Sequence, residues 1–286
     1  MTKTYNLFKR LLNIILIGIF LTTVLSVVTF SVSFDKEAKT LDMDAPLPII
    51  LMALTAVLFI TIAFLSVKMR KVQLEKIEKD TKLTYISSLF AAVMAFGAFV
   101  SDIVSKVKSN ADYGAIAYLQ ILLTLVTCAY FVVEALPLFT KRRVAVPELV
   151  LRALCVGAIL WAILGLFTIY FDTTGSILTS SIIYDGKILA YVTAAMFFVF
   201  EAERAHSNVN YGMYILSALL TALISFTICA GLVFCFVFGT LDAAELGFGV
   251  LDYSFAVGIG LFAVSRTYAV LDAMKTSAID TEKNNG

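Results

Sequence analysis

Long apolar stretches alternate with short polar segments along the whole chain, and this pattern predicts membrane-spanning helices. A helix needs about 20 residues to cross the hydrocarbon core of a bilayer. Eight stretches come close to or exceed that length, at 11–33, 47–67, 84–104, 114–138, 149–171, 186–203, 213–239 and 253–273. An α-helix satisfies its own backbone polar groups in lipid, and the alternation typical of a membrane β-barrel strand is missing. We therefore expect an all-α, polytopic transmembrane bundle of eight spans.

The spans also pair into four out-and-back hairpins, at 11–67, 84–138, 149–203 and 213–273. Aspartates flank each predicted outer turn at a period near 70 residues, as Asp35 and Asp44, Asp102 and Asp112, Asp172 and Asp185, and Asp242 and Asp252. Two interpretations stay open: a duplicated hairpin unit, or chance similarity among apolar helices with turns of similar length. In either case residues 1–274 form one transmembrane domain, and residues 275–286 form a polar tail that we expect to fray.

Composition and charge narrow the class and set the orientation. The chain is 60% hydrophobic and 15% charged, far from the balance of about 45–50% apolar and about 25% charged residues in soluble domains. Its net charge of +1 gives no bulk attraction to nucleic acid. Fifteen lysines and arginines fall on the side of the termini and five on the other side. The positive-inside rule then predicts cytoplasmic termini, and the short loops suggest a bacterial plasma membrane.

Four aspartates directly precede the predicted inbound spans and allow two interpretations. These residues are Asp44, Asp112, Asp185 and Asp252. An aspartate at this position often caps a helix by accepting hydrogen bonds from its first N–H groups, and we favour this structural role. The alternative is an acidic outer vestibule that concentrates cations, because the outer segments carry eleven acidic residues against five lysines.

Two charged residues inside the predicted spans have no opposite charge one helical turn away. They are Glu134 in the fourth span and Arg266 in the eighth. Ionisable groups in a membrane are costly and mark candidate functional sites. We expect the two to meet in the bundle interior, as a static pair or as a switchable pair in a solute or proton pathway. Alternatively, Arg266 snorkels to the inner headgroups and Glu134 faces a cytoplasmic cavity.

Other intramembrane polar groups have simpler interpretations. Glu148 and Arg152, like Glu201 and Arg204, are spaced for ion pairs within one helix, which we expect to be interfacial and of small energetic effect. Trp161 and the phenylalanines are expected to pack against lipid and neighbouring helices.

The residue inventory argues against catalysis. The chain contains a single histidine, His206, and no C-x-x-C or Walker sequence, so neither a histidine-based metal cluster nor a nucleotide loop is expected. We predict no catalytic residue, metal or cofactor. The four cysteines, all inside predicted spans, suit apolar packing.

Three functional classes remain, in decreasing order of support. The first is a non-enzymatic accessory, sensor or partner-binding membrane subunit, which would contact the lipid bilayer and another membrane protein. The second is a secondary transporter or channel that moves a small solute or cation past Glu134 and Arg266. The third, a membrane-embedded enzyme, has the least support because no cluster of catalytic residues is visible.

Overall fold

The computed structural model describes residues 2–35, 40–42, 44–70, 81–109, 115–140, 146–174, 182–204, 209–241 and 250–284, and almost all of these are helical. A short antiparallel pairing joins β1 (Phe34–Asp35) to β2 (Thr40–Leu41). The helices are α1 (Thr2–Ser33), α2 (Pro46–Met69), α3 (Lys82–Ser109), α4 (Ala115–Ala135), the 3₁₀ turn η1 (Leu136–Leu138), α5 (Glu148–Thr174), α6 (Ile182–Arg204), α7 (Tyr211–Ile224), the π-helix η2 (Ser225–Ala230), α8 (Gly231–Val237) and α9 (Val250–Asn284).

Seven helical segments among the described residues are long and apolar enough to cross a membrane, which supports the predicted class of membrane helix bundle. They are Tyr5–Ser33, Pro46–Met69, Lys82–Ser105, Ala115–Leu138, Glu148–Tyr170, Tyr211–Val237 and Val250–Thr276. The predicted span 186–203 forms α6, which is not one of the seven. This helix carries the five charged residues Asp185, Lys187, Glu201, Glu203 and Arg204.

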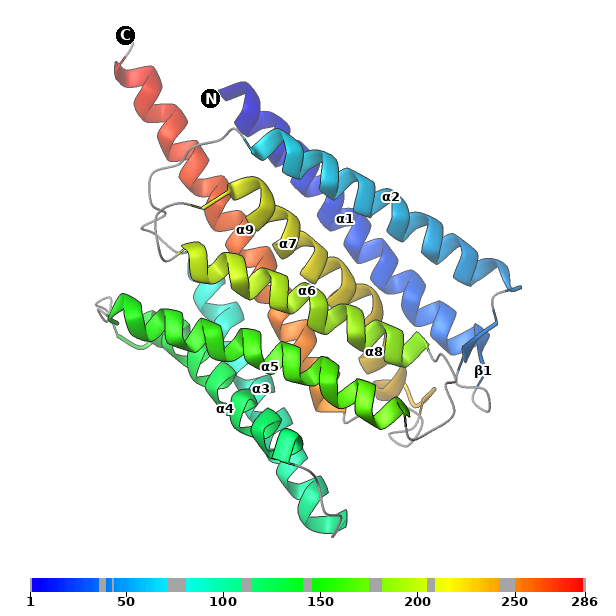
Figure 1. Ribbon diagram of the computed structural model, residues 1–286. Helices are drawn as coiled ribbons and strands as arrows, with labels where there is room; N and C mark the ends of the chain where they lie inside the picture. The colour runs from blue at the N-terminus through cyan, green and yellow to red at the C-terminus, as the bar shows by residue number, and fades with distance from the viewer. Residues whose placement is uncertain are drawn as a thin grey trace.

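Successive spans run in opposite directions, with α7, η2 and α8 forming one continuous span, and both chain ends lie at the same end of the bundle (Figure 1). The predicted hairpins correspond to α1–α2, α3–α4, α5–α6 and the α7–α8 segment with α9. Helix α9 lies at the centre, where it packs against α3, α7 and η2, while α2 contacts α1 and α7. The α3–α4 hairpin diverges from the other helices toward the end opposite the termini (Figure 1).

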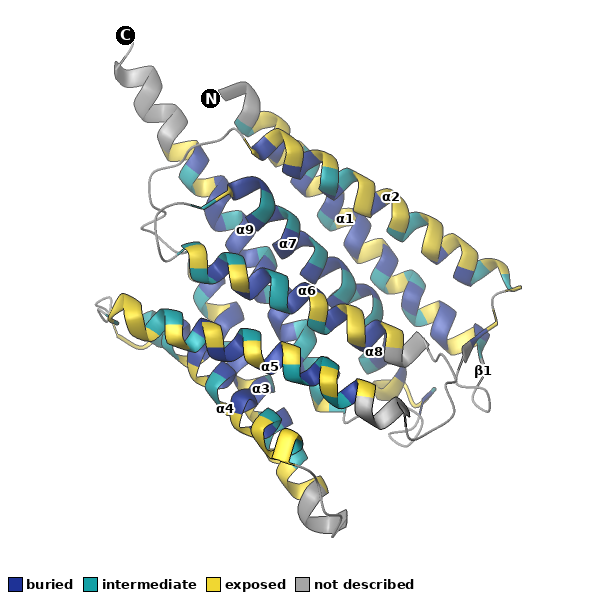
Figure 2. Cartoon of the chain, in the orientation of Figure 1, coloured by how far each residue is buried: buried dark blue, intermediate teal, exposed yellow. Residues whose placement is uncertain are grey.

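Burial follows the pattern expected of a bundle in lipid. The outward faces of α2, α4 and α5 are exposed, whereas α7 and α9 are largely buried (Figure 2). The exposed positions are mainly apolar and include Phe20, Ile60 and Val156. Lipid tails are as apolar as these side chains, so this surface suits a hydrocarbon environment rather than water.

Small residues let the central helices approach closely. A Cβ atom placed on Gly258 of α9 would lie 2.9 Å from the Cα atom of Ala91 in α3. At Gly212 in α7 it would lie 2.6 Å from the carbonyl oxygen of Ser66 in α2, whose hydroxyl donates to the Gly212 carbonyl at 2.8 Å. Close backbone approach of this kind stabilises helix pairs in membranes through dispersion contacts.

The last helix is longer than the sequence pattern predicts. We expected the eighth span to end near 273 and a polar tail to follow from 275, but α9 continues to Asn284. The extension contains neither glycine nor proline before Gly286, so nothing in its local sequence stops the helix.

Candidate functional site

Glu134 and Arg266 are in direct contact inside the bundle. Nη2 of Arg266 lies 2.6 Å from Oε2 of Glu134, which joins α9 to α4. Arg266 is 1% exposed and Glu134 is 8% exposed. The arginine therefore does not snorkel to a headgroup region, and the two groups neutralise each other's charge where water is scarce.

Two further charged residues, both from the last turns of α6, complete this contact. Nη2 of Arg266 also lies 3.0 Å from Oε1 of Glu201, which in turn lies 2.8 Å from Nη2 of Arg204. Arg204 approaches Oε1 of Glu134 at 3.8 Å. We call these four residues, Glu134, Glu201, Arg204 and Arg266, the ion cluster. Two carboxylates and two guanidinium groups leave it without net charge.

The expectation that Glu201 and Arg204 form a minor interfacial pair is wrong. Their i,i+3 contact exists, but Glu201 is only 2% exposed and is shared with Arg266. Spacing within one helix identifies the local pair, but it says nothing about which way that face of α6 points. Here the face points toward α9, where desolvation makes each partner more important than at a surface.

Tyrosine hydroxyls satisfy the remaining lone pairs of Glu201. Tyr130 of α4 donates to Oε1 at 3.0 Å, and Tyr214 of α7 donates to Oε2 at 2.6 Å. The guanidinium of Arg266 also lies 4.7 Å from the ring centroid of Phe262, a cation–π distance. The cluster thus links four helices, α4, α6, α7 and α9, at the end of the bundle near the termini.

A layer of aromatic rings closes the bundle next to the ion cluster. We call it the ring layer, and it consists of Tyr130, Phe131, Phe197, Phe198 and Phe262. The ring centroids of Phe131 and Phe262 lie 5.2 Å apart in an edge-to-face arrangement, and those of Phe197 and Phe262 lie 5.9 Å apart. All five side chains are fully buried, so this layer leaves little room for a solute.

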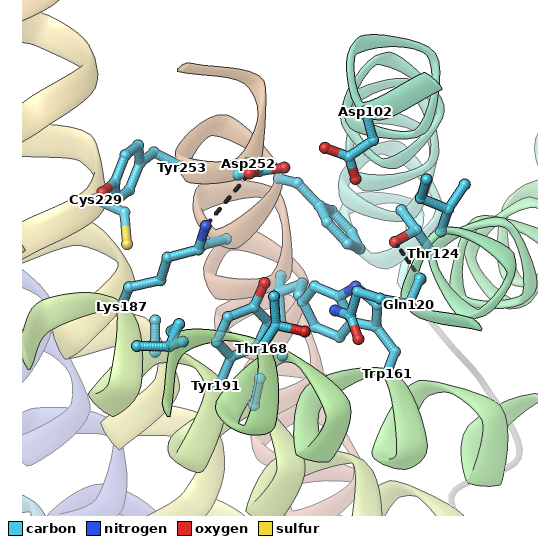
Figure 3. Close-up of a pocket in the computed structure, with 18 of the residues that line it drawn as sticks. Asp102, Gln120, Thr124, Trp161, Thr168, Lys187, Tyr191, Cys229, Asp252 and Tyr253 are labelled. Carbon is cyan, nitrogen blue, oxygen red and sulfur yellow. Dashed lines mark hydrogen bonds and ion pairs between the residues drawn. The ribbon is translucent and has the colours of Figure 1, made fainter. Parts of the chain in front are cut away.

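A pocket of about 370 Å³ lies on the other side of the ring layer, among α3, α4, α5, α6, η2 and α9 (Figure 3). Its floor is aromatic. The ring centroid of Trp161 lies 4.9 Å from that of Phe255, and the Phe255 centroid lies 6.1 Å from that of Phe131 in the ring layer. Its polar lining side chains are Asp102, Ser105, Gln120, Thr124, Thr168, Lys187, Tyr191, Ser225, Asp252 and Tyr253. Trp161 packs against neighbouring helices as expected, and it also lines the pocket.

An ion pair forms part of the pocket wall. Nζ of Lys187 lies 3.3 Å from Oδ2 of Asp252, and it lies 6.0 and 5.9 Å from the ring centroids of Tyr191 and Tyr253. Lys187 is 7% exposed, whereas the Asp252 side chain is 23% exposed. Figure 3 shows the lysine reaching from α6 to Asp252 on α9, with the Asp102 side chain on a third helix, α3.

A π-helix supplies another part of the wall. Ser225 and Cys229 of η2 line the pocket. A π-helical turn is less stable than an α-helical one and recurs at functional sites, because it re-aims side chains within a span. No glycine or proline lies within η2 itself, and Gly231 follows it directly.

The described aspartates do not act as the predicted N-caps. The N-cap of α2 is Ala45 without a side-chain cap bond, so Asp44 lies one residue too early. Asp185 and Asp252 lie inside the first turns of α6 and α9, where a negative charge still favours the helix dipole. Asp112 lies outside the described residues. Of the three positions that the structure describes, Asp252 alone lines the pocket.

The pocket and the ion cluster are connected by a common spacing. Gln120 and Glu134 on α4, Lys187 and Glu201 on α6, and Asp252 and Arg266 on α9 are each separated by fourteen positions. At 1.5 Å per residue this places the two sites about 21 Å apart along each helix. This shared spacing is the signal by which sequence alone could have identified Lys187 and Gln120.

Within the described part of the chain, no group of three histidine, cysteine, aspartate or glutamate residues is arranged to hold a metal ion. No known protein family, curated protein or solved structure matches this chain. The geometry of the pocket and the ion cluster is thus the main guide to function.

Proposed function

We propose that this protein is a membrane transporter for a small organic solute. The pocket is its binding site, and the ring layer and ion cluster form the closed barrier on the other side. The single observation that carries this proposal is a pocket of about 370 Å³ that combines charged, polar and aromatic groups and ends on that barrier. Its volume is at the lower end of the range of about 300–1,000 Å³ typical of small-molecule sites.

The depth of the pocket supports transport. Trp161 on its floor is the fourteenth residue of α5, a helix of 27 residues. The floor therefore lies near the middle of the span, about 20 Å from either helix end. Substrate sites of secondary transporters lie near the bilayer midplane at the interface between structural units, and this pocket lies between the α3–α4 hairpin, the α5–α6 hairpin and α9.

The orientation follows from the lysine and arginine distribution. We propose eight spans, which are the seven long apolar segments and α6, and cytoplasmic termini in a bacterial plasma membrane. The pocket then faces the outside, where the acidic segments lie, and the ion cluster faces the cytoplasm. The charged residues of α6 lie near its two ends, and its exposed positions between them, such as Leu189 and Val192, are apolar and suit contact with lipid.

The accessory-subunit function remains the main alternative. It rests on the missing catalytic and energising motifs and predicts a second membrane protein bound to an apolar flank. A subunit of that kind has no need of a solute-sized pocket with a buried ion pair in its wall. The pocket therefore favours transport, and association with a partner becomes an outcome of the experiment.

Trp161 makes the proposal testable without a label, because it is the only tryptophan of the chain and lies in the pocket. A panel of amines, alcohols, carboxylates, amino acids and sugars would be screened for changes in its fluorescence. Solutes that bind would then be assayed for uptake into proteoliposomes. We expect at least one bound solute to cross the membrane with the protein and not with empty vesicles.

A matched pair of variants controls the assay. Thr124→Phe adds a ring at a buried pocket position of α4, whereas Leu122→Phe adds one on the exposed face of the same helix. We expect Thr124→Phe to abolish binding and uptake and Leu122→Phe to preserve both. Solutes that bind but never cross, together with a stoichiometric membrane partner after mild purification, would instead establish the subunit function.

A further inference from the structure

We infer that the pocket binds uncharged, polyhydroxylated ring solutes of monosaccharide size. Their hydroxyl groups donate to Gln120 and neighbouring threonines, and one C–H face of the ring lies on the aromatic floor. This inference rests on the proposed function, because it names the class of solute for the same pocket. It is carried by three features of the lining: an unused acceptor, the pairing of the charged side chains, and the arrangement of the rings.

The lining offers oxygen acceptors to a ligand. Oε1 of Gln120 is buried without a hydrogen-bond partner, and it is the one such atom among the described lining residues. The hydroxyls of Thr124 and Thr168 donate to the backbone carbonyls of Gln120 and Leu164, each at 3.0 Å. Their protons are thus used within their own helices, and their lone pairs are left for the pocket. A solute with several hydroxyl donors complements these oxygens.

The charged side chains of the lining already interact within the protein. Nζ of Lys187 lies 3.3 Å from Oδ2 of Asp252 and within cation–π distance of two tyrosine rings. Asp102 also has an interaction within the protein. The unused acceptor, Gln120, is an uncharged amide. A charged solute has to compete for partners that are already engaged, at a site where uncompensated charge is costly, whereas an uncharged solute needs only hydrogen bonds.

The aromatic floor provides a surface for a sugar ring. The Trp161 ring centroid lies 5.0 Å from that of Tyr191 and 4.9 Å from that of Phe255. Gly165, one turn after Trp161 on α5, makes room for Tyr191, because a Cβ atom there would lie 2.5 Å from Cζ of the tyrosine. The C–H groups on one face of a pyranose are weakly positive, so they are attracted to the negative faces of such rings.

The acceptors and the floor lie on the same side of the pocket, away from the ion pair. Figure 3 shows Gln120, Thr124 and Trp161 on the side opposite Lys187 and Cys229. An apolar cavity of about 150 Å³ already holds benzene, so the pocket volume of about 370 Å³ has room for a six-membered ring with its substituents. One such ring can rest on the floor and donate to the neighbouring oxygens at the same time.

The test uses probes that share one carbon skeleton and differ in charge or shape. Glucose, galactose and mannose would each be compared with the amino sugar, the uronate and the open-chain alditol of the same configuration, by titration of Trp161 fluorescence in purified wild-type protein. The amino sugar adds a positive charge, the uronate adds a negative charge, and the alditol keeps the hydroxyls but lacks the rigid ring. We expect the best hexose to bind about tenfold more tightly than each of the three. An amino sugar, uronate or alditol that binds as tightly as its hexose overturns the inference, as does a panel in which no hexose binds.

Variants then test the role of Gln120. Gln120→Met removes the acceptor at similar side-chain length, and we expect it to weaken hexose binding about tenfold. Gln120→Glu keeps an acceptor at this position and should retain the preference for the hexose. Leu122→Met is the matched control, since it puts the same side chain on the exposed face of α4. Equal hexose affinities of Gln120→Met and Leu122→Met would contradict the assigned role of Gln120.

The uptake assay distinguishes the failure of this inference from the failure of the proposed function. A hexose that binds with the expected preference but is not taken up leaves the ligand class standing and overturns transport. A charged solute that is taken up better than any hexose leaves transport standing and overturns the ligand class.

Discussion

The guanidinium of Arg266 lies 3.0 Å from the carboxylate of Glu201, although Glu201 already has a partner in its own helix. Arg266 thereby bridges α6 and α9 in addition to its contact with α4. This contact raises the cost of removing any one charge from the ion cluster. The remaining charges would stay buried with an incomplete set of partners.

The first prediction concerns the contact between Glu134 and Arg266. Each of Glu134→Gln and Arg266→Met is expected to lower the free energy of unfolding by about 3–5 kcal/mol, because each leaves an uncompensated buried charge. The double variant should lose clearly less than the sum of the two. A thermal denaturation series in detergent would measure this cycle, and strictly additive losses would show that the two residues are not coupled.

The second prediction concerns the tyrosine hydroxyl that completes Glu201. Tyr214→Phe removes a 2.6 Å hydrogen bond to a buried carboxylate and should lower the free energy of unfolding by about 1.5–3 kcal/mol, the range for hydrogen bonds to charged groups. The same experiment on Tyr5→Phe, near the start of α1, provides the comparison. A loss at Tyr214 no larger than at Tyr5 would exclude an energetic role for this hydrogen bond.

The third prediction compares the ion pair between Lys187 and Asp252 with the pair between Glu134 and Arg266. Lys187→Met leaves Asp252 without its partner, but the Asp252 side chain is 23% exposed and can recover solvent. We therefore expect a loss of about 1 kcal/mol, close to the upper range for accessible pairs and well below that for Glu134→Gln. The same denaturation series would decide this, and a larger loss for Lys187→Met would reverse the ranking.

The fourth prediction concerns the approach of α9 to α3. Gly258→Ala places a methyl group 2.9 Å from a backbone atom of Ala91 and forces the helices apart, so we expect a loss of about 1–3 kcal/mol. Gly97→Ala in the same interface meets only Leu251 side-chain atoms at 3.6 Å. That substitution should be neutral or mildly stabilising, and similar melting temperatures for the two variants would contradict the close approach.

Sequence patterns predicted the parts of this molecule that depend on local physics. Apolar stretches of sufficient length predicted the helices, and the absence of a partner one turn away singled out Glu134 and Arg266. The same logic failed for Glu201. Its local partner Arg204 gave no reason to expect a further contact with Arg266 of α9. A local pattern cannot show which helix faces a given residue.

Sequence patterns missed the pocket for a related reason. Lys187 counted as one of five outer basic residues, and Trp161 resembled any other ring in an apolar helix. Only the packing of α3, α4, α5, α6, η2 and α9 places these residues around a common space. The predicted helix starts were also wrong in detail. Asp185 and Asp252 lie within the first turns of α6 and α9, whereas we expected them at the N-cap positions.

The fourteen-residue spacing on α4, α6 and α9 has a mechanical consequence. Each of these helices carries one group in the pocket and one in the ion cluster, so a rigid tilt or rotation of any of them displaces both groups at once. A ligand that draws the pocket walls together therefore also shifts the ion cluster, because α4, α6 and α9 each connect the two sites. By thermodynamic linkage, whatever loosens the ion cluster must change ligand affinity by the same factor that the ligand changes the cluster's stability.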